Sequence, residues 1–276
     1  MNQTFSLTRF GRLLGKYFTD NRGQLLANLA LLACVLAATS FLFYIGLPQE
    51  VDGKRQVPFF IIGWGAWYVF IWQQTEALNQ RERAITYLMQ PASKLEKIGL
   101  IWLVSGIGFL IVYLLVFTAV DAVGVALVNN RQWTPEQLRQ VGSYRLAPWY
   151  RSSKFFDNMP AILVVWSVLL HPFVMAFFLT FRRYTLPLVA VFAFVLVLGG
   201  FFANTAILGQ LLGVESGSVN NAFPFGNFWI RSPPNREFRQ VDLPQPIGNQ
   251  IRYSVGIAAV VLLYVTAYFR LKEREV

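Results

Sequence analysis

The chain has 276 residues, of which 55% are hydrophobic and only 14% are charged, and its mean hydropathy is +0.45. A soluble domain usually carries about a quarter of charged residues, so this composition excludes an ordinary soluble domain and favours an integral membrane protein. The net charge of +10 would suit a nucleic-acid-binding protein, but the basic residues flank apolar runs and form no stripe with stacking aromatics. We therefore assign them to the membrane surface and expect no nucleic-acid partner.

The first 24 residues predict an amphipathic helix that lies in the membrane interface. Five apolar residues recur at the spacing of one helical face, and the cations Arg9, Arg12 and Lys16 fall elsewhere on the helix. The apolar face would enter the bilayer while the cations meet anionic headgroups. The alternative is an ordinary soluble helix packed on a domain. The apolar face consists of Phe10, Leu13, Leu14, Tyr17 and Phe18.

Residues 25–276 predict a single transmembrane domain of six helices, so the expected fold class is an all-α integral membrane protein. Each predicted span is long enough to cross a hydrocarbon core of about 30 Å. The first span has two alternatives, a cleaved signal peptide and a lipoprotein cleavage site at Cys34, but its length and the apolar residues after Cys34 favour a span. The predicted spans are 25–47, 58–74, 98–128, 160–181, 185–207 and 251–269.

The polar segments between these spans predict the topology. Residues 48–57 are expected to form a short polar loop. Two longer excursions, residues 129–159 and 208–249, are expected on the outer side of the membrane. Thr134 followed by Pro135 is a helix start, because proline fits the first helical position. Asp121 is expected at the outer interface, where a charge costs little. Basic residues in the short loops and chain ends favour cytoplasmic N- and C-termini.

A short polar island, residues 75–97, separates the second and third predicted spans. Residues 82–89 have helical composition and can form about two turns before Pro91 stops them. Ser93 and Glu96 have the spacing of a capping box that opens the next helix. A helical turn of this kind between two spans suits contact with another protein at the membrane face.

Few polar residues lie within the predicted spans. His171 precedes Pro172 in the fourth span, and an ionisable group at that depth should face the protein interior. It belongs either to a translocation path or to a structural hydrogen bond near the Pro172 kink. Asn204 has the same two interpretations, and Gln73 and Gln74 are expected to form interhelical hydrogen bonds. The sequence has no zinc-protease or serine-hydrolase pattern, and a single histidine and a single cysteine predict neither a metal site nor a disulfide.

This arrangement resembles the membrane subunit of a type-2 ABC transporter permease. That family has an amphipathic elbow helix, six spans and a cytoplasmic coupling helix between the second and third spans. The sequence of residues 81–97 (RERAITYLMQPASKLEK) resembles the family's segment before the third span. Together with the C-terminal RLKEREV, it looks most like a Bacteroidetes-type branch of the family. One departure is the long segment 129–159, which the family usually keeps short.

The resemblance implies a function. A separate cytoplasmic ATPase would dock on the 76–97 segment, and the chain would pair with a second copy or a related permease in the bacterial inner membrane. This chain would be no enzyme and hold no cofactor of its own, because it lacks a phosphate-binding loop and ATP would bind the partner. The alternative is a non-transporting structural or accessory subunit of a larger membrane complex. The residues implied to contact the ATPase are Glu82, Arg83, Tyr87, Leu88, Met89 and Pro91.

Overall fold

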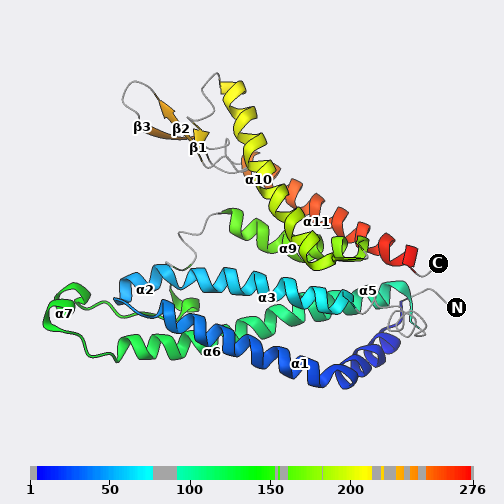
Figure 1. The fold of residues 1–276 in the computed structure, drawn as a ribbon, viewed down its shortest axis with the longest axis horizontal. Coiled ribbons are helices and arrows are strands. Elements are labelled where there is room, and N and C mark those ends of the chain that lie inside the picture. Colours follow the sequence, from blue (N-terminus) through cyan, green and yellow to red (C-terminus); the bar gives the residue numbers. More distant parts are fainter. Residues whose placement is uncertain are drawn as a thin grey trace. The chain divides into compact units, whose positions relative to one another are not determined.

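The computed structural model describes residues 5–76, 92–152, 155, 161–181, 183–212, 219–220, 228–232, 237–241 and 247–274. It divides into two compact units, Met1–Met159 with Arg274–Val276 (unit 1) and Pro160–Glu273 (unit 2). The two units are described separately, and Figure 1 labels their elements. Most of the described chain is helical, as the composition predicts.

Unit 1 is built on three long rods. α1 (Leu7–Phe43), α3 (Gln56–Glu76) and the continuous rod of α5 (Lys94–Trp102), the π-helical segment η1 (Leu103–Gly108) and α6 (Phe109–Asn129) lie side by side (Figure 1). Three short helices lie near one end of these rods. They are α2 (Pro48–Lys54), α7 (Pro135–Val141) and the 3₁₀ turn η2 (Trp149–Arg151).

The helix α1 is longer than either segment predicted in its place. It joins the predicted interfacial helix and the first predicted span in one helix of 37 residues, which is about 55 Å long at 1.5 Å per residue. Its N-terminal part runs in a different direction from the rest (Figure 1). The backbone hydrogen bonds therefore continue where the sequence suggested a boundary near residue 24.

Residues 48–57 correct one expectation, because they form no polar loop. Pro48 occupies the first turn of α2, where a proline costs no hydrogen bond, and Glu50 lies in the same turn. α3 begins almost at once, at Gln56. The corner between α1 and α3 is thus helical, and it buries Val51, Asp52 and Arg55.

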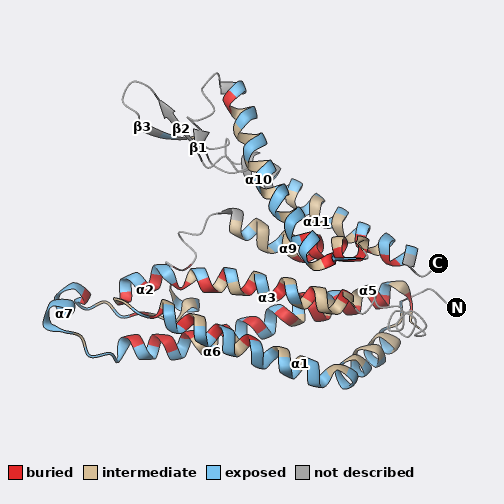
Figure 2. Cartoon of the chain, viewed as in Figure 1, coloured by how far each residue is buried: buried red, intermediate tan, exposed pale blue. Residues whose placement is uncertain are grey.

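Aromatic side chains fill the space between α3 and α6. The ring of Phe59 lies 4.8 Å from that of Phe117, and Trp67 stacks on Phe109 at 5.9 Å between ring centroids. The Tyr113 hydroxyl donates to the Phe59 carbonyl at 2.5 Å. Gly63 makes this approach possible, since a Cβ there would lie 2.9 Å from the Tyr113 ring. In Figure 2 the buried residues of α3 and α6 accordingly lie where the two rods face each other.

Unit 2 consists of α9 (Ala161–Thr180), α10 (Thr185–Leu212), α11 (Ile247–Arg274) and a small antiparallel sheet. The strands β1 (Val219–Asn220), β2 (Phe228–Ser232) and β3 (Glu237–Val241) pair in the order β1-β2-β3, with Trp229 opposite both Asn220 and Gln240. The sheet lies within the predicted excursion 208–249 and departs from the all-α expectation. Short alternating segments of this kind give too weak a periodic signal to stand out between long apolar runs.

Five helices are long and apolar enough to cross a membrane, within the residues that the structure describes. They are α1, the α5–η1–α6 rod, α9, α10 and α11, and they fall on five of the six predicted spans. The remaining predicted span, 58–74, is the second in chain order, and it falls on α3, a helix of 21 residues. Three tryptophans, a tyrosine and two glycines interrupt the aliphatic residues of α3 and lower its hydropathy.

The exposed side chains also favour a bilayer. Large apolar residues on α10 and α11 are open, with Phe194 64% exposed, Leu211 76% and Leu262 65%. A monomeric soluble protein rarely exposes apolar surface on this scale. Lipid tails would cover these faces without a cost in hydration, so the fold is compatible with a membrane protein.

Gly124 on α6 offers a test of the packing in unit 1. A Cβ at this position would lie 2.5 Å from the Tyr44 ring, and Tyr44 is held in place because its hydroxyl donates to Asp121. We expect Gly124→Ala to destabilise the purified protein by about 1–3 kcal/mol through overpacking, measured by thermal unfolding in detergent.

The matched control is Gly199→Ala on α10, where an added Cβ meets no atom within 4 Å. It should keep or slightly raise the unfolding temperature, because alanine favours helix more than glycine does. Equal unfolding temperatures for Gly124→Ala and the parent protein would contradict the close contact with Tyr44.

Candidate functional site: two polar clusters at the ends of unit 1

The residues predicted to contact an ATPase lie outside the described part of the chain. Glu82, Arg83, Tyr87, Leu88, Met89 and Pro91 all fall between the end of α3 at Glu76 and Ser93, the residue before α5. What the structure describes is how the two flanking helices are held. Both are attached to α1 by polar contacts. We call the residues that make them the hinge cluster: Ser6, Arg9, Tyr17, Asn28, Gln73, Gln74 and Glu96.

Glu96 is the centre of the hinge cluster. The Glu96 N–H donates to Ser93 Oγ at 3.2 Å, and the Ser93 N–H donates back to Glu96 Oε2 at 2.7 Å, which confirms the predicted capping box. Its other oxygen, Oε1, accepts from the Ser6 N–H at 2.6 Å and from Arg9 Nη2 at 3.1 Å. One fully buried carboxylate thus satisfies the first turn of α5 and joins it to the start of α1.

The end of α3 is attached to α1 in the same way. The Tyr17 hydroxyl donates to Gln74 Oε1 at 2.5 Å, and Asn28 Nδ2 donates to Gln73 Oε1 at 2.7 Å. These contacts confirm the interhelical hydrogen bonds predicted for the two glutamines. Both ends of the 77–91 segment are therefore fixed to one helix.

The apolar face of the N-terminal helix is turned partly toward the protein. A Cβ at Gly99 of α5 would lie 3.6 Å from the Phe10 ring, and Tyr17 reaches α3. Leu14 and Phe18 line a groove between the rods, and Phe18 is 49% exposed. Leu13 is half-buried. This part of α1 combines contact with its own fold and an open apolar surface.

The π-helical segment η1 interrupts the regular hydrogen bonding of the third rod. In this segment the Ser105 carbonyl accepts from Trp67 Nε1 of α3 at 2.6 Å, and Ser105 Oγ donates to the Ile101 carbonyl at 2.7 Å. Segments of this type often mark functional positions in helices. Here η1 directly follows α5, the helix whose first turn belongs to the hinge cluster.

The second cluster lies at the other end of the rods and is buried. Arg55, the residue between α2 and α3, contacts Asp52 of α2 at 2.5 Å and Asp121 of α6 at 3.2 Å. The side chains of Arg55 and Asp121 are fully buried. Asp121 was expected at the outer interface, a position that stays a prediction; the fold buries its carboxylate and pairs it with Arg55. We call Asp52, Arg55 and Asp121 the charge cluster.

The charge cluster holds the segment after α6. Arg55 Nη1 donates to the Ala147 carbonyl at 2.7 Å, and the Trp149 N–H donates to Asp121 Oδ2 at 2.8 Å. The Tyr144 hydroxyl donates to Asp52 Oδ2 at 2.7 Å. Residues predicted as an outer excursion are therefore packed against the rods, and the predicted helix start at Thr134 and Pro135 is confirmed by α7.

Neutral donors offset the surplus negative charge of two carboxylates around one guanidinium. The hydroxyls of Tyr44 and Tyr144 both donate to these carboxylates. Burial and the neighbouring Asp52 raise the pKa of Tyr144 to about 12, so this hydroxyl stays protonated at neutral pH. The cluster is thus internally satisfied except at Arg55 Nε, which has no hydrogen-bond partner among the described residues.

The sequence analysis did not identify Asp52 and Arg55. Both lie in the segment interpreted as a polar loop, and nothing in their spacing shows a distant partner. The available signal was Asp121, a carboxylate within an apolar run, because a charge in such a place needs a partner of opposite sign.

His171 lies in unit 2 and forms an interhelical contact. Its Nδ1 is 2.9 Å from the Tyr264 hydroxyl of α11, and the side chain is buried at 3% exposure. This partner is a tyrosine hydroxyl of another helix and not the backbone carbonyl freed by Pro172 that the structural interpretation expected, and a translocation path stays a prediction. Asn204 is half-buried on α10.

Comparison with known proteins finds no relative: no protein-family model, no curated protein and no solved structure matches the chain. Over the described residues, no group of three His, Cys, Asp or Glu side chains is placed to hold a metal ion. The site therefore has to be interpreted from its own geometry.

The charge cluster predicts unequal effects for two neighbouring cations. Removing Arg55 leaves two buried carboxylates without their cation, so we expect Arg55→Met to destabilise the protein by about 3–5 kcal/mol. Lys54 is the control: it pairs with Glu50 at 3.1 Å on the surface, and Lys54→Met should cost less than ~1 kcal/mol. Thermal or denaturant unfolding in detergent measures both, and similar losses would contradict the burial of the cluster.

Tyr144 predicts a loss of stability at high pH. Its pKa of about 12 in the fold exceeds the ordinary value of 10, so its contribution to stability is complete below pH 10 and is lost as the pH rises toward 12. We expect Tyr144→Phe to show a shallower decline of the unfolding free energy over that window. Between pH 7 and 9 the slopes of variant and parent should be equal, and a decline just as steep in the variant above pH 10 would contradict the assignment.

Proposed function

We propose that this chain is the permease subunit of an ABC transporter, moving a substrate across the bacterial inner membrane with a separate ATPase subunit. The proposal combines six spans, α3 included, with a cytoplasmic coupling helix at residues 82–89. The N-terminus of α1 would act as the elbow helix, and the functional unit would contain two permease chains. Its support in the sequence is the resemblance of residues 81–97 to type-2 permeases.

One structural observation carries the proposal: both helices that flank residues 77–91 are hydrogen-bonded to α1. A segment that transmits the movement of an ATPase to the spans needs flanking helices that stay attached to the rest of the fold. The Glu96 contacts with Ser6 and Arg9 fix one end, and the contact between Tyr17 and Gln74 fixes the other. Displacement of the segment would then move three rods together.

A second candidate is a non-transporting structural or accessory subunit. The charge cluster favours it, because it holds the described segment Asn129–Ser152 against the rods at the opposite end of unit 1. Asn129 adds to these contacts: its side chain makes two hydrogen bonds with the backbone of Leu146, at 2.9 and 3.0 Å. A surface held in this way suits lasting contact with a partner more than a passage for substrate.

Copurification separates the two candidates. The protein is purified in a mild detergent from its own membranes, and its partners are identified by mass spectrometry with their stoichiometry. We expect one ATPase chain per permease, and we expect Glu82→Ala and Tyr87→Ala each to lower its recovery by about tenfold or more, as loss of an anchor residue does.

Matched controls are Glu136→Ala on α7 and Tyr150→Ala on η2. Both residues are exposed and belong to the segment after α6, so the same substitutions should leave the ATPase bound. A large complex without any ATPase would support the structural candidate. Equal loss in the controls would show that docking does not occur at residues 82–89.

A further inference from the structure

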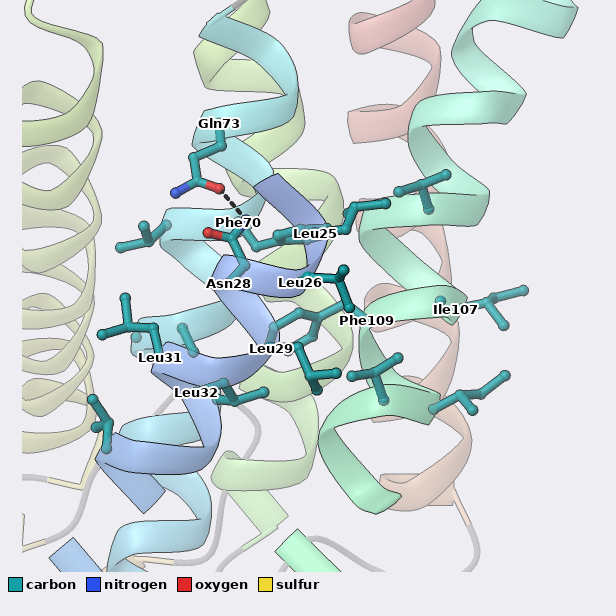
Figure 3. Close-up of a pocket in the computed structure, with 18 of the residues that line it drawn as sticks. Leu25, Leu26, Asn28, Leu29, Leu31, Leu32, Phe70, Gln73, Ile107 and Phe109 are labelled. Carbon is teal, nitrogen blue, oxygen red and sulfur yellow. Dashed lines mark hydrogen bonds between the residues drawn. The ribbon is translucent and has the colours of Figure 1, made fainter. Parts of the chain in front are cut away.

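Unit 1 contains an apolar groove that its described side chains leave open. It has a volume of about 920 Å³ and lies between α1, α3 and the η1–α6 part of the third rod (Figure 3). Sites for small molecules have volumes of about 300–1,000 Å³, so the groove is large enough to hold a ligand.

The groove is apolar along its length and polar at one end. Figure 3 shows Leu29, Leu32 and Phe109 along the apolar part, and the hydrogen bond between Asn28 and Gln73 near the other end of the view. Besides these two amides, the only polar side chain that lines the described groove is Arg22. A ligand that fits such a lining has a long apolar part and one polar head.

The lining on α1 runs from Leu14 to Val35, and the part from Arg22 onward is long enough for one acyl chain. Arg22 and Val35 both line the groove and lie thirteen positions apart on α1, which corresponds to about 20 Å along a helix. One leaflet contributes half of the ~30 Å hydrocarbon core, about 15 Å. An acyl chain that starts at Arg22 would thus follow the groove toward the middle of the bilayer.

The charge around Arg22 determines which head group fits. Arg22 is exposed, and no carboxylate among the described residues pairs with it. Asp20 is near in sequence but does not line the groove. A cation at the membrane surface attracts anionic lipid, so a phosphate with net negative charge is the complementary head group.

The same charges disfavour a second copy of the chain as the occupant. A twofold dimer would place the same surface of both copies together. Arg12, Lys16 and Arg22 of one copy would then face their like-charged counterparts. An anionic lipid meets no such repulsion.

We propose that this groove is a binding site for an anionic phospholipid, with one acyl chain between α1, α3 and α6 and the phosphate at Arg22. The lipid would fill the space between the rods on the side of the hinge cluster. The site does not depend on ATPase docking, and it would exist in either candidate function.

Native mass spectrometry of the detergent-purified chain tests the site by titration with phosphatidylglycerol and with phosphatidylcholine of the same acyl chains. We expect one tightly bound phosphatidylglycerol. Arg22→Gln should weaken it about fivefold and remove the preference over phosphatidylcholine. The control Lys16→Gln removes a cation from the same helix outside the groove and should leave the preference intact.

A second variant tests the apolar part. Gly65 lines the groove, and an added Cβ there meets no atom within 4 Å, so Gly65→Phe extends a ring into the open space. It should weaken both lipids about tenfold or more, because the chain loses its apolar contacts. Gly199→Phe on α10, where the space is equally open, controls for the added ring.

Two outcomes would overturn the proposal. In the first, phosphatidylglycerol binds all four variants as it binds the parent protein, which makes the binding nonspecific. In the second, Gly65→Phe leaves lipid binding unchanged but converts a dimer into a monomer, which shows a second copy in the groove. Circular dichroism and size-exclusion chromatography check that Gly65→Phe folds, and Arg22→Gln decides the head group independently.

Discussion

Asp121 is the point at which the segments of unit 1 meet. Its carboxylate, on α6, accepts a hydrogen bond from the Tyr44 hydroxyl that follows α1 and another from the Trp149 N–H. It also pairs with Arg55, the residue between α2 and α3. A buried carboxylate is tolerated only if its charge is balanced and its oxygens are hydrogen-bonded. Because each partner comes from a different segment, the requirement of this one group fixes their relative positions.

The hinge cluster uses the same principle at the other end of the rods. Glu96 is buried, and its partners come from its own helix start and from the start of α1. Between the two clusters the contacts are mostly apolar and aromatic, as expected for helices that lipid surrounds. The polar interactions determine which helices adjoin, and the aromatic rings then fill the space between them. The groove beside α1 is the part of unit 1 that its own side chains leave open.

This distribution of contacts relates the fold to both proposals. Helices joined firmly at their ends and loosely along one side can move as a body while lipid covers the open side. The π-helical turn of η1 lies within the third rod, where its Ser105 carbonyl turns to Trp67 of α3. Unit 2 is different: α10 and α11 expose large apolar side chains, and His171 of α9 contacts Tyr264 of α11.

The sequence by itself determined the helices and several of their ends. Long apolar runs predict α1, α6, α9, α10 and α11, since in lipid a helix satisfies every backbone polar group within its own segment. Capping boxes predict the starts of α5 and α7, because the groups that form them are only three residues apart. Gln73 and Gln74 were expected to bond between helices, because amides within an apolar region need partners.

Only the tertiary structure decided which distant residues meet. The ion pair of Arg55 with Asp121 joins residues 66 positions apart, and the contact of Ser6 with Glu96 joins residues 90 apart. No local pattern encodes such separations, since the pairing depends on how the rods pack. The continuity of α1, the helical corner of α2 and the sheet of unit 2 were missed for a related reason: their sequences carry weak local signals that long-range contacts complete. The mostly helical fold with long apolar helices was therefore available from the chain alone, and the sheet of unit 2 and the geometry of the polar clusters were not.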